Sequence, residues 1–204
     1  MADEKEVVGV AAGMNTGVLS LFFCFFFLLP LSGCLDCERT SVSIDLVYKM
    51  AEVKFSNVVS NSTDEKTIRE DFQDLIEKAY FDEASKSDPD RITSRRLYRN
   101  DERLDGVERF SFQSLARVLK EFNIETDKSG NYILDITKES ENYQISGNGQ
   151  PIGKDSKRFL KWPKNAKKIE FEENRKEFDE TKKTSLLKPW LDWINKNTKK
   201  EQAK

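Results

Sequence analysis

The apolar residues of the chain separate one uncharged segment near the start from a longer region in which apolar and polar positions alternate. Residues 18–31 carry no charge and are mostly Leu and Phe. As a helix, these residues would span about 21 Å, which is less than the ~30 Å hydrocarbon layer of a bilayer. Pro30 favours the end of such a helix. A short apolar segment that ends in this way is typical of a cleaved export signal.

Periodicities in the longer region predict strands and helices. One apolar series alternates with mostly polar residues and predicts a strand with one buried face: Val42, Ile44, Leu46 and Tyr48. Ser62 to Glu65 forms a capping box, which predicts the start of a helix. The apolar side chains after it share one helical stripe and are expected to pack on the core: Ile68, Phe72, Leu75, Ile76, Ala79 and Tyr80.

The second half of the chain predicts further short elements. Its periodicities and turn signals predict a strand and helix at 107–122, a hairpin turn at 127–130, a strand at 131–137, a hairpin of 158–162 with 168–172, and a helix from about Pro189. Asp127, Ser129 and Asn131 also match the first positions of a calcium loop. The turn is favoured because Tyr132 and Lys138 stand where that loop requires Gly and Glu.

These elements predict one α+β domain over residues 41–197, followed by a lysine-rich tail at 198–204. We expect an antiparallel or mixed sheet with two or three helices packed on one face. A chain of about 170 residues after the apolar segment is long enough for one domain with its own core.

The end of the apolar segment carries a specific motif. Ordinary signal peptidase requires small residues at −3 and −1, and a cut before Cys34 would place Leu31 at −3. Leu31-Ser32-Gly33-Cys34 instead resembles the lipobox of bacterial lipoproteins and matches it at all four positions. The motif requires Cys because a thiolate is the nucleophile that forms the thioether with the lipid. The resemblance implies a signal peptide at 1–33 and a lipid anchor, including palmitate-type acyl chains, on Cys34.

The residues before the motif depart from the usual bacterial pattern. The first 13 residues carry three acids against Lys5, and a start at Met14 would supply no Lys or Arg. Signals of this kind, followed by domains rich in Lys, Glu and Asn, are similar to those of spirochaetal lipoproteins. Two alternatives stay open: an uncleaved anchor, or secretion after a cut that follows Cys34.

Residues 34–40 are expected to form a short lipidated tether that reaches at most ~20 Å. The residue after Cys34 is Leu35, whereas enteric lipoproteins retained at the inner membrane carry Asp there. The resemblance therefore favours the outer membrane of a bacterial cell envelope.

Charge and cysteine content exclude several functions. One lysine and three acids precede Cys34, so the remaining chain carries 33 basic and 33 acidic residues. This balance argues against nucleic-acid binding. A zinc or redox site at Cys34 and Cys37 is disfavoured because zinc would need two more ligands, and the chain has no His and no later Cys. We expect no metal and no cofactor.

One basic segment is a candidate site for a polyanion, such as an anionic lipid or envelope glycan. Its members are Lys154, Lys157, Arg158, Lys161, Trp162, Lys164, Lys167 and Lys168. Six acids follow within residues 170–180, so the alternative is that the two segments pair across the predicted hairpin.

The predicted function is that of a lipid-anchored envelope protein whose domain binds a macromolecular partner or has a structural role. No catalytic residue is identified. One alternative is a carrier of an apolar ligand, which would need a deep cavity. The other is an envelope hydrolase, which without His would use paired carboxylates or a Ser-Lys arrangement.

Overall fold

A long antiparallel hairpin of strands β1 (Leu35–Asp45) and β2 (Met50–Ser60) forms the centre of the larger sheet. The computed structural model describes residues 35–81, 92–137, 143–154 and 157–202. Val42 and Ile44 are buried, as the alternation predicts. The strand nevertheless ends at Asp45, and Tyr48 lies in the turn.

The predicted tether is also corrected by this strand. Residues 35–40 form the first half of β1, because the side chains of Leu35, Cys37 and Thr40 are buried and their backbone pairs with β2. Residues 35–40 therefore belong to the folded domain.

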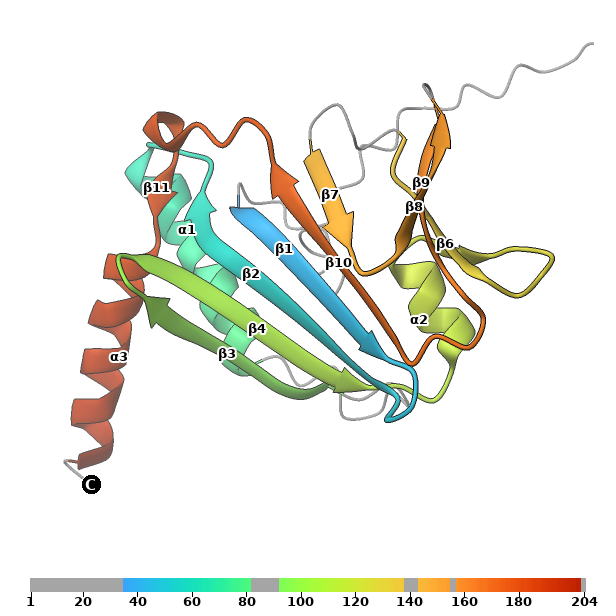
Figure 1. Ribbon diagram of the computed structural model, residues 1–204. Helices are drawn as coiled ribbons and strands as arrows, with labels where there is room; N and C mark the ends of the chain where they lie inside the picture. Colours follow the sequence, from blue (N-terminus) through green and yellow to red (C-terminus); the bar gives the residue numbers. More distant parts are fainter. Residues whose placement is uncertain (1–34, 82–91, 138–142, 155–156, 203–204) are drawn as a thin grey trace, which may run out of the picture.

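The larger sheet contains seven strands, and every pairing in it is antiparallel. Its order is β3 (Ile92–Asn100), β4 (Arg103–Ser111), β2, β1, β10 (Lys168–Arg175) and β7 (Tyr143–Gly147), and β11 (Thr184–Ser185) pairs with the end of β2. Strands from both halves of the chain thus meet at the centre of the molecule (Figure 1).

A second, four-stranded sheet stands beside the first (Figure 1). Its order is β5 (Ile124–Thr126), β6 (Tyr132–Asp135), β9 (Lys157–Trp162) and β8 (Gln150–Lys154). The predicted turn that joins β5 to β6 is confirmed, because the Asp127 carboxylate accepts the backbone N–H groups of Ser129 (2.8 Å) and Asn131 (2.9 Å).

The predicted hairpin of 158–162 with 168–172 is wrong. Strands β9 and β10 are consecutive in the chain, but β9 pairs with β6 and β8 while β10 pairs with β1 and β7. In this arrangement both edges of each strand are paired, and the chain crosses between the two sheets at residues 163–167.

Three α-helices lie in the described part of the α+β domain, in which strands predominate: α1 (Glu65–Ile76), α2 (Leu115–Glu121) and α3 (Leu187–Gln202). A π-helix, η2 (Glu77–Phe81), extends α1, and a short 3-10 helix, η5 (Glu180–Lys182), precedes β11. The N-cap of α1 is Asp64, not Ser62, because the Asp64 carboxylate accepts the N–H of Thr67 at 2.9 Å.

Two clusters of buried apolar residues hold these elements together. The first joins both sheets to α2 through the cluster Val42, Ile44, Phe110, Val118, Phe122, Leu134, Trp162 and Phe171, among others. The second joins the start of β1 to α1 and α3 through Leu35, Val58, Leu75, Ile76, Leu97, Leu104, Leu186 and Trp190. Phe55 packs against both clusters, so the two cores are continuous.

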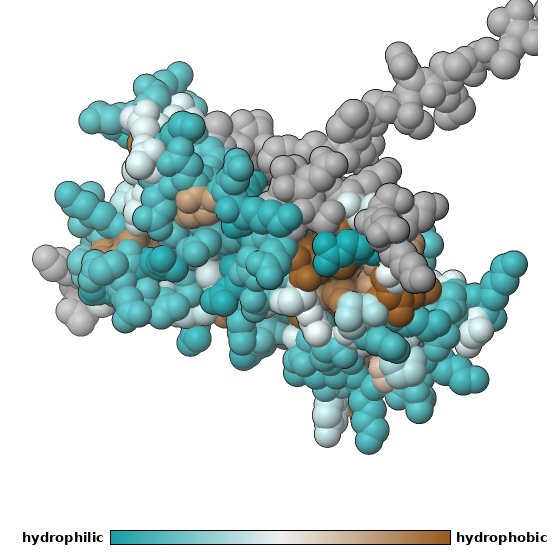
Figure 2. All heavy atoms as spheres, turned by 45° about the horizontal axis from the view of Figure 1, so that its top comes forward, coloured by the Kyte–Doolittle hydropathy of each residue, from teal (hydrophilic) through white to brown (hydrophobic). Residues whose placement is uncertain are grey.

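Figure 2 shows one face of the molecule, which is dominated by hydrophilic residues and has a smaller apolar area. In the described ranges, none of the helices combines the length and the apolar composition that crossing a bilayer requires.

Candidate functional site

The start of β1 is the part of the domain closest in sequence to the predicted lipidation residue. Cys34 itself lies outside the described residues. Leu35 is only 6 % exposed and belongs to the apolar cluster shared with α1 and α3. A group attached to Cys34 would thus be joined to the sheet without an intervening linker.

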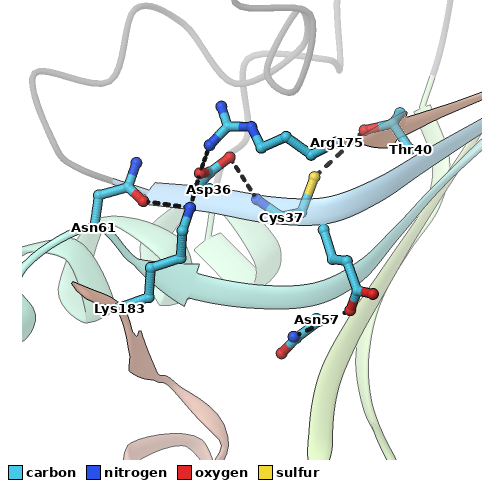
Figure 3. Close-up of polar contacts among 8 residues, drawn as sticks. Asp36, Cys37, Thr40, Asn57, Asn61, Arg175 and Lys183 are labelled. Carbon is cyan, nitrogen blue, oxygen red and sulfur yellow. Dashed lines mark hydrogen bonds and ion pairs between the residues drawn. The ribbon is translucent and has the colours of Figure 1, made fainter. Parts of the chain in front are cut away.

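Asp36 is the centre of a buried polar cluster at this end of β1 (Figure 3). Its Oδ2 accepts from the guanidinium of Arg175 and from the ammonium of Lys183, and the side chain of Asp36 is 3 % exposed. Lys183 also donates to Oδ1 of Asn61 at 2.9 Å. Arg175 ends β10 and Lys183 directly precedes β11, so Asp36 ties the start of β1 to two late segments of the chain.

The other carboxylate oxygen of Asp36 accepts the backbone N–H of Cys37 at 2.9 Å. The Cys37 sulfur lies 3.3 Å from the Thr40 hydroxyl, and both residues are 2 % exposed. We call Asp36, Arg175, Lys183 and Asn61 the Asp36 clamp. The carboxylate of Asp36 is paired with two cations, so the cluster holds the start of β1 in place by electrostatic attraction.

Asn57 on β2 has an irregular backbone conformation near the same end of the sheet. Asn57 has a φ of 56°, in the left-handed region that Asn tolerates better than most residues. Its N–H donates at 2.9 Å to the side-chain Oδ1 of the buried Asp105 on β4, instead of to a backbone carbonyl of that strand. Asp105 also accepts from Asn100 at 2.8 Å, so this buried carboxylate is hydrogen-bonded as well.

The residues of the predicted basic segment do not form one common surface, because they differ in their partners and in their exposure. Lys161 pairs with Asp127 at 3.1 Å, and Lys168 pairs with Glu170 at 2.6 Å, so only the second pair uses the predicted acidic segment. Trp162 is 2 % exposed and belongs to the core, with its Nε1–H donated to Oδ1 of Asn148 at 2.5 Å. Arg158, Lys164 and Lys167 are exposed, and the side chains of Lys154 and Lys157 lie outside the described part.

An open depression of about 510 Å³ lies on the larger sheet and is lined mainly by charged and hydroxyl side chains. Its members include Ser41, Ser43, Glu52, Lys54, Glu170 and Glu172. Burial raises the pKa of Glu52, but hydrogen bonds from Arg109 and Lys54 outweigh this effect and hold the pKa below its usual range. A hydrolase with two carboxylates would need one acid with a raised pKa, and Glu52 does not meet that requirement.

A smaller cavity lies between α1 and strands β3 and β4. It is lined by Phe55, Leu75 and Leu97 among others, and its volume is about 40 Å³. Pockets for small ligands usually measure about 300–1,000 Å³, so this cavity does not support the alternative of an apolar-ligand carrier.

Sequence reasoning missed the Asp36 clamp. The available signal was the position of Asp36 between the apolar residues Leu35 and Cys37, which is unusual for a flexible tether. Its partners lie 139 and 147 residues further along the chain, and no local pattern identifies them.

Comparison with known proteins found no matching family model, no matching curated protein and no matching solved structure.

Proposed function

We propose that the protein is a bacterial lipoprotein, anchored in the cell envelope through an acylated Cys34, whose domain binds a macromolecular partner or has a structural role. The observation that carries the proposal is the sequence Leu31-Ser32-Gly33-Cys34 at the end of an uncharged segment. In this proposal residues 1–33, or 14–33, are the signal peptide, and a spirochaetal type of signal fits the missing positive charge.

The Asp36 clamp supports an anchoring role for the start of the domain. A domain attached through Cys34 transmits any pull from the membrane to β1 first. Asp36 and the buried Leu35 hold that strand to β10, β11 and α3. A free, flexible terminus would need neither a buried ion pair nor a buried Leu at these positions.

A partner-binding or structural role is supported by an open face of the larger sheet. We infer that all three helices and the second sheet lie on one side of this sheet, because Phe55 packs against both apolar clusters. The other side then carries the open depression with Ser41, Ser43 and Glu172, where a glycan or an envelope protein would meet polar groups.

The outer membrane is the favoured location. The residue after Cys34 is Leu35, not the Asp that retains enteric lipoproteins at the inner membrane. Leu35 also has a structural reason to be apolar, since it is buried in the core shared with α3. Separation of inner and outer membranes by density, followed by immunoblotting, tests this location.

Lipid attachment is tested in the producing cell. The wild-type chain should incorporate labelled palmitate, and an inhibitor of lipoprotein signal peptidase should leave a precursor heavier by the signal peptide. Cys34→Ser should abolish both effects. Cys24→Ser is the matched control within the apolar segment and should change neither. Cys37→Ser should also keep the label, although it replaces a buried thiol. A wild-type product without label, and of the same size with and without inhibitor, would disprove the anchor.

A further inference from the structure

We propose that the turn between β1 and β2, residues 46–49, is a contact site for an anionic lipid surface. Val47 is 61 % exposed and Tyr48 is 78 % exposed. Two other large apolar residues with high exposure, Tyr80 and Phe81, contact the ring of Trp193. The side chains of Val47 and Tyr48 instead extend from the tip of a hairpin.

Hydrogen bonds order the backbone of the turn without any partner. Oδ1 of Asp45 accepts the N–H groups of Val47 at 2.9 Å and of Tyr48 at 2.8 Å. The N–H of Leu46 donates to the carbonyl of Lys167 at 2.9 Å, and Leu46 packs on the first apolar cluster. Because the backbone is already ordered, contact with a partner would require little loss of conformational entropy.

Two lysines lie in or next to the turn. Lys49 belongs to the turn, and Lys167 is held beside it by the Leu46 hydrogen bond. Both side chains are exposed, and neither has a carboxylate partner within the described ranges. Of the nearby acids, Glu170 pairs with Lys168 and Glu52 pairs with Lys54 and Arg109. Asp45 accepts backbone N–H groups and keeps its negative charge, so Lys49 and Lys167 exceed it by one positive charge. The charge available to a partner is therefore positive.

This combination fits the interface of a bilayer. Tyrosine is favoured at the headgroup level, an aliphatic side chain such as Val47 favours the acyl boundary, and lysines reach lipid phosphates. The site is a projecting tip and not a groove. A fluid surface can adapt to such a tip, whereas a protein partner would need a matching pocket.

The position of the turn suggests that this contact orients the domain on the membrane. This role rests on the proposed lipid anchor. The turn and Leu35 lie at opposite ends of β1 (Figure 1), and a strand of this length spans about 35 Å. A lipid on Cys34 keeps the turn close to a membrane, so even a weak contact would be occupied. Anchor and turn together would set the orientation of the domain on the bilayer.

The test uses the natively processed full chain, mixed with vesicles of phosphatidylcholine alone or of phosphatidylcholine with phosphatidylglycerol. A photoreactive phenylalanine analogue replaces Tyr48, and in a matched control it replaces Lys128, an exposed residue in the turn between β5 and β6. Lipid adducts should form several-fold more at position 48 than at position 128, and mainly in the anionic vesicles. Lys49→Ser and Lys167→Ser should each reduce these adducts about fivefold.

Equal adduct formation at both positions would overturn the proposal. Adducts from position 48 to protein, in place of lipid, would also overturn it and would identify a protein interface. Labelled palmitate on Cys34 is measured in the same sample. Palmitate without adducts would remove the turn contact alone, and adducts without palmitate would support the contact but disprove the lipid anchor.

Discussion

Asp36 shows how one carboxylate secures the start of a central strand. Its side chain is 3 % exposed, and two cations from distant segments bind the same oxygen. Burying a charge is costly, so removal of one partner from such a group leaves the others uncompensated. The clamp therefore makes the position of β1 sensitive to a single substitution.

Asp36→Asn should lower the free energy of unfolding by about 3 kcal/mol, because Arg175 and Lys183 lose their shared counter-charge. Urea unfolding of the purified chain measures this loss. Glu38→Gln is the control on the same strand: its ion pair with Arg103 is half exposed, so the loss should be below about 1 kcal/mol. Similar losses in both variants would contradict the clamp.

Asp127 gives the turn between β5 and β6 a dependence on pH. Hydrogen bonds from the side chain and backbone of Asn131, together with one from Lys161, hold its pKa well below the ordinary value of 3.8. The folded state thus binds this proton more weakly than the unfolded state, and the stabilisation is present above about pH 4 and lost at lower pH.

The difference in urea midpoint between the wild type and Asp127→Asn should therefore shrink as the pH is lowered from neutral to about 2.5. The asparagine retains an acceptor for the turn but has no charge to titrate. A difference that stays constant over this range would show that the charge of Asp127 contributes nothing.

At the scale of the elements, the connection between β9 and β10 determines how the chain passes from the second sheet to the larger sheet. Strand β9 ends at the buried Trp162, and β10 begins six residues later in the other sheet. The chain makes a similar crossing between β7, in the larger sheet, and β8, in the second sheet, at residues 147–150. Gly149 lies there against the ring of Trp162, and its buried position leaves no room for a side chain.

Gly149→Ala should destabilise the domain by about 1–3 kcal/mol, because the added Cβ would lie 2.7 Å from Cε2 of Trp162. Gly106→Ala is the matched control. Its Cβ would meet the flexible end of Leu97 at 3.4 Å, so the change should stay below about 1 kcal/mol. Urea midpoints and the near-ultraviolet signal of tryptophan measure both. A stable Gly149→Ala variant with an unchanged signal would contradict this packing.

At the scale of the whole molecule, the two sheets share one continuous apolar core. The first apolar cluster contains residues from both sheets and from α2, and Phe55 connects it to the second cluster. The start of β1 belongs to this core, which moves the boundary of the domain from residue 41 to residue 35.

A chain that begins at Leu35 should therefore unfold in a single transition. A chain that begins at Glu38 lacks the buried Leu35 and Cys37 and the carboxylate of the Asp36 clamp, and should be less stable by more than about 3 kcal/mol. Thermal unfolding followed by circular dichroism compares the two. Equal midpoints would restore the view of residues 35–40 as a tether.

Local patterns were sufficient for much of the secondary structure. The alternation at Val42 and Ile44, the apolar stripe of α1 and the Asp127 turn each depend on residues within a few positions of one another. Periodicity and short-range hydrogen bonding are physical properties of such segments, so the sequence by itself determines them. The α+β class follows from the same patterns.

The tertiary structure decided which surfaces meet. Periodicity shows that Trp162 and Ile169 each have a buried face to fill, but it does not say which sheet supplies the partner. The partners of Asp36 are likewise set by the folding of residues 139 and 147 positions away. The exposure of Val47 and Tyr48 depends on where β1 ends. An apolar or charged residue specifies the kind of environment it requires, and only the packed chain specifies which residues provide it.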